Sequence, residues 1–294
     1  MAKLSYISSD DRKYNMGRVL SLIKSDVLGQ IQNSTNIVVK PSCMSDNLQL
    51  ASTHADALEA LFEFISPYAK NQIILADGCS KGDTMNAFRN YGYFKVQDSF
   101  DFAIVDLNKD EIVDFPKSNA SDSIKIAKTI AEADCIISIC PPRTDNTVLY
   151  SGAVKNIFEG AVPKYRSTFS SRFSESFHRN TPPNDSQAQI DFASDSFAYA
   201  YNSLPYVLAL IDGYSALQSE ASIYEGEMVS SHWAIASTDA VFADYLSCQL
   251  LGIESSNVAY LDNLIDPDHK NQIIVGDDWK KRVIKIKTPK NFQP

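Results

Sequence analysis

The chain has 294 residues, of which 44% are hydrophobic and 21% charged, and its net charge at pH 7 is −9. This length is sufficient for a full hydrophobic core. The negative charge argues against a nucleic-acid partner, because phosphate binding depends on clustered lysine and arginine. The sequence begins MAKLSYISSDD, without the apolar stretch of a signal peptide, and no window approaches the ~18 apolar residues of a membrane helix. We therefore expect a cytoplasmic protein with no membrane or nucleic-acid partner.

The first half of the chain alternates between helical and strand periodicity. The predicted elements are a helix at 17–32, a strand at 36–41, a helix from about residue 53, strands at 72–78 and 101–106, a helix at 121–133 and a strand at 134–142. Short apolar strands separated by helices are typical of βαβ units. The pattern predicts an α/β fold with a mostly parallel sheet that is covered by helices on both faces.

The second half of the chain is less regular. The predicted elements there are strands at 206–214 and 232–237, a helix capped by Thr238 and ended by Gly252, a long loop at 161–186, and a lysine-bearing edge strand at 280–287. We expect a single α/β domain over residues 1–294. Its two lobes, at about 1–160 and 187–294, are predicted to be joined by the loop 161–186.

Polar residues follow most of the predicted strands. In an open parallel sheet, ligands bind beyond the carboxyl ends of the strands. The polar residues at these positions are Lys40, Asp77, Asp106, Arg143, Asp212, Ser237 and Asp239. Each of them alone could simply end a strand or cap the next helix. Together, two sets of opposite charge at one edge favour a ligand-binding cleft.

The segment SGAVKNIFEG at 151–160 predicts a short helix that begins with small residues. A helix N-terminus attracts anions, and Gly152 would let a ligand approach the backbone. We expect Lys155 and Asn156 to assist, with Lys40, Arg143 and Ser237 as further ligand-binding residues. The alternative is that Lys155 is an ordinary surface lysine of an amphipathic helix.

Three residues are candidates for proton transfer: His54, Asp77 and Asp212. A divalent cation, Mg²⁺ or Mn²⁺, could instead be held by Asp77, Asp106 and Asp239, because carboxylate oxygens suit these hard ions. His178 in the long loop could enter the cleft, whereas His232 and His269 have no assigned role.

The five cysteines have no CxxC spacing, so we expect no iron–sulfur cluster within this chain. Cys43, Cys79 and Cys140 follow or end predicted strands, and a soft-metal or redox cluster of these three is one alternative. The other is that they are small buried hydrophobes.

Several segments, in their order along the chain, resemble the domain of unknown function 362 family. They are KP at 40–41, TH at 53–54, ADG at 76–78, DL at 106–107, AD and IIS within 133–138, SGAVKNIFEGAVP at 151–163, IDGYSAL at 211–217, and AS-x-D with Asp244 and Gly252 in the following helix. A more distant similarity of AD-x-II and G-x-x-K to the nickel-dependent lactate racemases implies a related architecture.

Two departures from that family are visible. Ser42 stands where the family often has Asn, and Arg143, Thr144 and Asp145 stand where it often has Lys-Thr-His. The loss of that histidine puts a metal or proton-transfer role of position 145 in doubt. The resemblance also implies that some relatives are fused to iron–sulfur modules.

The leading hypothesis is an enzyme that acts on a small anionic metabolite, a carboxylate or phosphate, in the cleft at the carboxyl edge of the sheet. The alternative is a non-catalytic protein, either a ligand sensor or a partner of a redox or metallocofactor assembly. A third possibility is a copy that has lost its activity.

Overall fold

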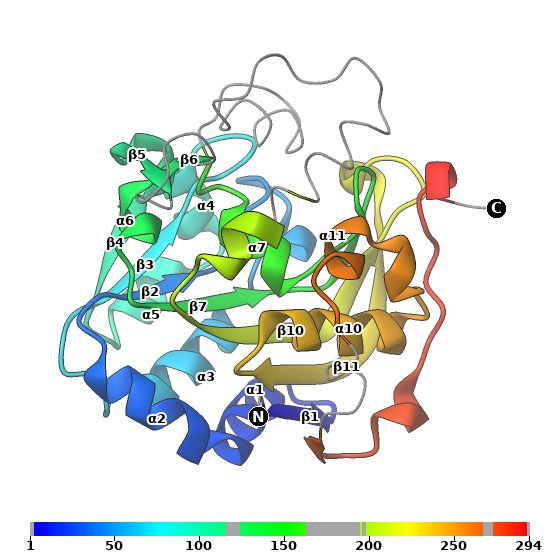
Figure 1. Ribbon diagram of the computed structural model, residues 1–294, viewed down its shortest axis with the longest axis horizontal. Helices are drawn as coiled ribbons and strands as arrows, with labels where there is room; N and C mark the ends of the chain where they lie inside the picture. Colours follow the sequence, from blue (N-terminus) through cyan, green and yellow to red (C-terminus); the bar gives the residue numbers. More distant parts are fainter. Residues whose placement is uncertain (1–2, 116–123, 163–194, 196–197, 267–272, 293–294) are drawn as a thin grey trace.

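A computed structural model describes residues 3–115, 124–162, 195, 198–266 and 273–292 (Figure 1). The main sheet has the strand order β12-β1-β11-β10-β7-β2-β3-β4, with β8 and β9 attached beside β10. Its strands are β1 (Leu4–Ser8), β2 (Ile37–Lys40), β3 (Ile73–Asp77), β4 (Phe102–Asp106), β7 (Cys135–Cys140), β8 (Arg143–Asp145), β9 (Leu149–Ser151), β10 (Tyr206–Gln218), β11 (Glu227–Ser237) and β12 (Ile274–Gly276). A separate hairpin pairs β5 (Ile112–Phe115) with β6 (Ile124–Ala127).

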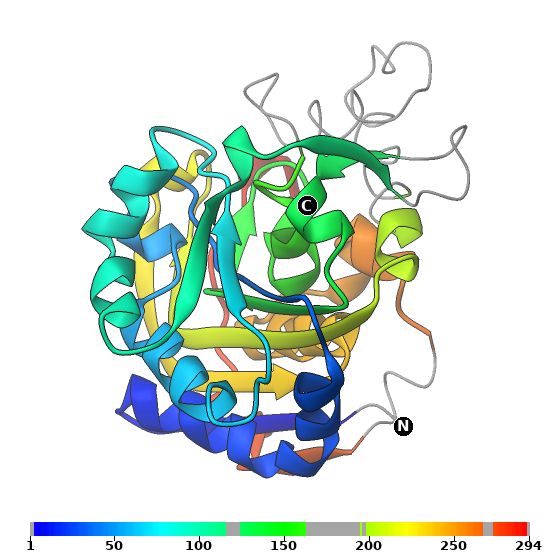
Figure 2. The ribbon, with the colours of Figure 1, turned by 90° about the vertical axis from the view of Figure 1, so that its left-hand side faces the viewer.

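Most neighbouring strands of this sheet run parallel. The pairs β10/β7, β7/β2, β2/β3, β3/β4 and β1/β12 are parallel, whereas β11 is antiparallel to both β10 and β1. The expectation of a mostly parallel α/β sheet with a less regular second half is therefore confirmed. The pairing also joins the two halves of the chain, because β1 lies beside β11 and β7 lies beside β10 (Figures 1 and 2).

Helices cover both faces of the sheet, as predicted. The helices are α1 (Arg12–Leu22), α2 (Lys24–Asn33), α3 (Ala55–Ile65), α4 (Thr84–Asn90), α5 (Tyr93–Gln97), α6 (Lys128–Ala131), α7 (Ala153–Phe158), α10 (Ala240–Leu251) and α11 (Ala259–Asp262). Apolar residues of α1 to α5 pack with one set of strand residues, such as Val39 and Leu210. Those of α6, α7, α10 and α11 pack with the alternate set, such as Val38 and Ile211. Because successive side chains of a strand point to opposite faces of the sheet, each strand contributes residues to two hydrophobic cores, one on each face.

Several predicted elements differ from the structure in physically simple ways. The helix predicted at 17–32 is two helices that meet at Ile23, and part of the helix predicted at 121–133 is the strand β6. Asp239, not Thr238, caps α10, because its carboxylate accepts the amide N–H groups of Val241 and Phe242; Gly252 ends the helix in the left-handed conformation as expected.

The basic run 280–287 is also not an edge strand. It begins with the 3-10 turn Trp279–Arg282 and continues without regular structure. Residues 163–186 of the predicted loop, His178 and His269 lie outside the described residues. No described helix has the length and apolar character needed to cross a membrane.

Candidate functional site

The carboxyl edge of the parallel strands brings together five of the predicted residues. Lys40, Asp77 and Asp106 are the last residues of β2, β3 and β4, and Arg143 follows β7. Ile211 pairs with Cys140, the last residue of β7, so Asp212 is the next residue along β10 and also lies at this edge.

Ser237 and Asp239 do not belong to this edge. They follow the carboxyl end of β11, which is antiparallel to β10, so they lie at the opposite edge of the sheet. Ser237 pairs with Ala209 and is fully buried, and its hydroxyl accepts the Asp239 N–H at 3.1 Å. The prediction of a site that includes these two residues is wrong, because it assumed that every strand runs in the same direction.

A cavity of about 280 Å³ opens at the carboxyl edge beside Asp212. Its walls are formed by Arg12, Gln49, Leu50, Ser52, His54, Pro141, Asp212, Tyr214, Ser215 and Met228. Two of the three predicted proton-transfer residues, His54 and Asp212, therefore meet in one cavity together with an arginine.

Arg12 reaches the cavity because of a strand that the sequence reasoning missed. β1 is parallel in direction to β10, since both are antiparallel to β11. Its carboxyl end therefore lies at the same edge, where the Asp11 side chain caps α1 and Arg12 begins it. The short run LSYIS, followed by the helix-start pattern SDDR, was the available signal.

The Arg12 guanidinium is held on two sides. Its Nε lies 3.1 Å from Oδ2 and 3.3 Å from Oδ1 of Asp212, and its Cζ lies 4.6 Å from the centre of the Tyr214 ring. Among the described residues, no protein acceptor is bonded to the two terminal nitrogens of Arg12. These N–H groups are the donors that an anion in the cavity would use.

Asp212 is the buried partner of this pair, with 3% of its side chain exposed against 16% for Arg12. Burial raises the pKa of Asp212 above its usual value, while the positive charge of Arg12 and the Tyr214 N–H act to lower it. The buried carboxylate therefore depends on Arg12 to remain ionised.

His54 stands at the start of α3 as its N-cap. Its Nδ1 accepts the N–H of Asp56 at 3.2 Å, which assigns the proton of the neutral ring to Nε2. Burial, and then the nearby charge of Arg12, lower the pKa of His54. A neutral imidazole at pH 7 can act as a general base through Nε2 when its ring proton moves to Nδ1, which lies 3.4 Å from the Asp56 carboxylate.

Lys40 and Asp77, at the ends of β2 and β3, form a separate and fully buried ion pair at the carboxyl edge of the sheet. Lys40 Nζ contacts Asp77 Oδ1 and donates to the Pro41 carbonyl at 3.1 Å, and both side chains are at most 2% exposed. Burial raises the pKa of Asp77 to about 6, although Lys40 opposes this. Asn156 donates to the Lys40 carbonyl at 3.0 Å, so it holds the backbone at this point.

Arg143 and Lys155 lie in a closed ring of four buried charges. Arg143 bonds to Asp145 at 3.1 Å and Glu159 at 2.7 Å, and Lys155 bonds to the same two carboxylates at 2.9 and 3.1 Å. Burial alone would raise the pKa of Asp145 and Glu159, but the two cations hold both pKa values below their usual range. Lys155 is 1% exposed, so the alternative of a surface lysine is wrong.

The sequence reasoning did not find Asp145 and Glu159 as partners in this ring. Glu159 was detectable, because it stands four residues after Lys155 on the same helix face. Asp145 comes from a different element, β8, and only the fold places it there.

The start of α7 is occupied by a carboxylate of the chain itself. Asp244 of α10 accepts the N–H groups of Ala153 at 2.6 Å and Val154 at 3.0 Å. A Cβ at Gly152 would collide with Asp244 and Tyr150, so this glycine permits close packing. The small residues expected to admit a ligand instead admit the side chain of another helix.

The predicted metal ligands do not converge. Asp77 and Asp106 are neighbours on β3 and β4, but Asp239 lies at the opposite edge beyond β10, β7 and β2. Lys40 contacts Asp77, and Lys109 lies 3.0 Å from Asp106. Within the described parts of the chain, no three His, Cys, Asp or Glu side chains form a group that could hold a metal ion.

Cys43, Cys79 and Cys140 are all buried free thiols. Burial raises the pKa of Cys43 and Cys140 well above that of an ordinary thiol. Cys79 Sγ lies 2.9 Å from the Lys81 carbonyl, and Cys43 Sγ lies 3.8 Å from the Tyr93 hydroxyl. These contacts fit the alternative of small buried side chains.

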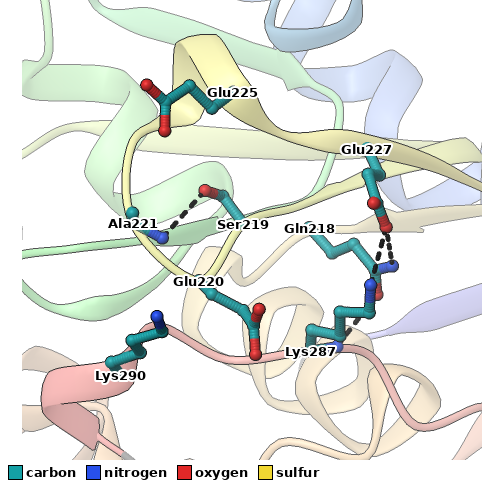
Figure 3. Close-up of a pocket in the computed structure, with 8 residues that line it drawn as sticks. All are labelled: Gln218, Ser219, Glu220, Ala221, Glu225, Glu227, Lys287 and Lys290. Carbon is teal, nitrogen blue, oxygen red and sulfur yellow. Dashed lines mark hydrogen bonds and ion pairs between the residues drawn. The ribbon is translucent and has the colours of Figure 1, made fainter.

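A second cavity, at the far end of the β10–β11 hairpin, is polar and contains none of the predicted residues (Figure 3). Lys287, from the basic run 280–287, lies 2.9 Å from Glu227 there, and Gln218 donates to the same carboxylate at 3.2 Å. The charges at this cavity are thus partly paired by the C-terminal segment.

Comparison with solved structures finds eight matching chains, two of which are as follows. One is the lactate racemase apoprotein from Thermoanaerobacterium thermosaccharolyticum, with 15% identity, a TM-score of 0.45 and coverage of 83% of this chain and 55% of that one. The other is a protein from Thermotoga maritima, with 13% identity, a TM-score of 0.46 and coverage of 82% and 59%. The chain thus spans less than two thirds of both proteins.

No curated protein matches this sequence. The model of the family described as "Domain of unknown function (DUF362)" matches residues 37–249, which is well over half of the chain. The matched segment includes His54 and Asp212 of the cavity and the complete charged ring around Lys155. The chain therefore belongs to the DUF362 family, as its sequence motifs indicate.

Proposed function

We propose that this protein is an enzyme that binds a small carboxylate in the cavity at the carboxyl edge and transfers a proton to or from it. The observation that carries this proposal is the meeting of Arg12, His54 and Asp212 in one cavity. An arginine with unbonded terminal N–H groups, beside a neutral histidine and a buried carboxylate, combines anion binding with acid–base chemistry.

Each wall of the cavity has a role in this proposal. The terminal N–H groups of Arg12 bind the carboxylate of the ligand. Leu50, Pro141 and Met228 contact its apolar part. In the tautomer with its proton on Nδ1, which lies 3.4 Å from the Asp56 carboxylate, His54 has a free lone pair on Nε2 and accepts the proton of the ligand there.

Binding is tested by titrating the protein with sodium butyrate, whose short alkyl chain suits the apolar wall. We expect saturable binding in the wild type and its loss in Arg12→Gln. The matched control is Arg18→Gln, because Arg18 is an exposed arginine on the same helix, outside the cavity. Equal affinity in wild type and Arg12→Gln contradicts the proposal.

Proton transfer is tested by incubation in D₂O with small hydroxy-, oxo- and amino-carboxylates, followed by NMR. An active enzyme catalyses exchange of a carbon-bound hydrogen, and His54→Gln lowers the rate by roughly 10² or more. Arg12-dependent binding without any exchange would favour the ligand sensor, or a copy without activity, over the enzyme.

The Mg²⁺ or Mn²⁺ ion and the redox or metalloprotein partner remain predictions from the sequence. Dialysis against each metal followed by elemental analysis tests the first. Co-purification under anaerobic conditions tests the second.

A further inference from the structure

The cavity is electrically balanced before any ligand enters. Of the residues that line it, Arg12 carries one positive charge and Asp212 one negative charge, while His54 is neutral at pH 7. A ligand with one negative charge therefore meets one cation that is already paired. A phosphate dianion would find no second cation in the lining.

A ligand anion competes with Asp212 for the same guanidinium. Both carboxylate oxygens of Asp212 lie within 3.3 Å of Arg12 Nε, and the aspartate is more deeply buried than the arginine. An incoming carboxylate reaches Arg12 from the open side of the cavity. With the ligand on the terminal N–H groups, one guanidinium faces two carboxylates, so the buried Asp212 carboxylate no longer has a full counter-charge, which is costly unless it is neutralised.

We propose that this site, on the basis of the function proposed above, binds monovalent carboxylates together with one proton, which Asp212 takes from solvent as the ligand carboxylate becomes the counter-ion of Arg12. The bond that breaks is the Arg12–Asp212 ion pair, and the bonds that form are the Arg12–ligand ion pair and an O–H on Asp212. Charge is conserved in the cavity, because one anion and one proton enter together.

The other charged and titratable groups around Asp212 do not replace this role. Tyr214, two residues further on β10, donates its N–H to Asp212 Oδ1 at 3.3 Å. His54 faces it from the start of α3, and Asp56 lies 3.4 Å from the Nδ1 of that histidine. The His232 ring of β11 is tilted by 34° to the Tyr214 ring, with 4.6 Å between their centres, and its Nδ1 lies 2.8 Å from Asp10 Oδ1. Among these, Arg12 is the charge that most strongly favours ionised Asp212.

Binding and protonation are therefore linked. Where Asp212 is ionised in the free protein and protonated in the complex, each added pH unit weakens carboxylate binding about tenfold. Inorganic phosphate, which is largely a dianion above neutral pH, binds more weakly than butyrate at pH 8.

The test is calorimetric titration with sodium butyrate between pH 6 and 8, in pairs of buffers that differ in ionisation enthalpy. We expect net proton uptake in the wild type, and the same uptake in His54→Gln, which removes the other candidate proton acceptor. In Asp212→Asn, uptake is lost and binding becomes independent of pH and tighter, because no carboxylate competes for Arg12.

The outcomes separate the two proposals. Arg12-dependent butyrate binding without proton uptake in the wild type overturns the present inference and leaves the proposed function intact. Uptake that disappears in His54→Gln also overturns it, because the proton then goes to the histidine. No Arg12-dependent binding at any pH contradicts the proposed function itself. The wild-type proton count decides the inference even if Asp212→Asn does not fold.

Discussion

Replacement of Lys155 by methionine tests the buried ring of four charges. The methionine keeps the length of the side chain but removes the Nζ that bonds to Asp145 at 2.9 Å and Glu159 at 3.1 Å. Two charge-assisted hydrogen bonds, at about 1.5–3 kcal/mol each, correspond to a loss of about 3–6 kcal/mol. Removing one partner of a buried ion pair gives a similar figure, about 3–5 kcal/mol.

Urea unfolding, followed by circular dichroism, measures this loss. With a slope of about 3 kcal/mol per molar urea, a loss of 4 kcal/mol lowers the midpoint by about 1.3 M. The matched control is Lys128→Met, because Lys128 pairs with Glu111 at 2.7 Å on the surface. We expect no change in the midpoint for this control, since exposed ion pairs contribute little.

The double variant Lys155→Met, Glu159→Gln shows whether charge balance is the cause. It leaves Arg143 with Asp145, whose atoms lie 3.1 Å apart, and removes the unbalanced carboxylate. We expect the double variant to be more stable than Lys155→Met alone. Equal stability of wild type and Lys155→Met, or a double variant with the two losses simply added, would refute the reasoning.

Three further predictions concern packing and pH. Gly160→Ala should lower the free energy of unfolding in urea by about 2–5 kcal/mol, because a Cβ at this left-handed residue would collide with Asp77 and Gly78. The control Gly17→Ala, in open space on α1, should raise it by about 0.5–1 kcal/mol. Equal effects of the two substitutions would contradict this account. Burial raises the pKa of Asp244 to about 7 from an ordinary 3.8, so the unfolded chain releases this proton at lower pH than the folded chain, and the free energy of unfolding falls as pH rises between about 4 and 7. In Asp244→Asn this part of the pH dependence should be lost. An unchanged profile would show that Asp244 titrates normally. The lowered pKa of Asp145 has the opposite sign: the stability that it contributes is complete above its unfolded pKa of 3.8 and is lost as pH falls below that value, so Asp145→Asn should flatten the acid limb of the unfolding curve.

The sequence was sufficient for the parallel strands because each is a short run of mostly apolar residues, and the central strands β2 and β7 are buried on both faces. The strands expected at 36–41, 72–78, 101–106 and 134–142 are β2, β3, β4 and β7. Strand direction was not readable in the same way. A hairpin and a βαβ unit differ in the connection, and the predicted strands 206–214 and 232–237 were too short to show that β10 and β11 extend to Gln218 and Glu227 and pair there as a hairpin. Because the antiparallel direction of β11 was not predicted, Ser237 and Asp239 were assigned to the wrong edge of the sheet.

The charged residues show a second limit of sequence reasoning. Lys40, Arg143 and Lys155 were expected to hold a ligand because they follow predicted strands or begin a helix at the carboxyl edge, yet each has a carboxylate partner in the structure. The partner of Lys40 is 37 residues away and the partner of Asp212 is 200 residues away. Such pairs are set by which strands become neighbours. Residue type and position after a strand could identify the edge but not which charges neutralise one another there.

The location of Arg12 determines how far family membership informs the proposed function. His54 and Asp212 lie within residues 37–249, which match the family model, whereas Arg12 lies before them. Arg12 reaches the cavity only because β1 adds to the far side of β11 and carries α1 to the carboxyl edge. The matched segment alone therefore supplies a buried carboxylate and a histidine without the cation that would bind an anion. Removal of β1 and α1 would leave Asp212 buried and unpaired, so the anion site and the ionised state of Asp212 depend on the same N-terminal segment.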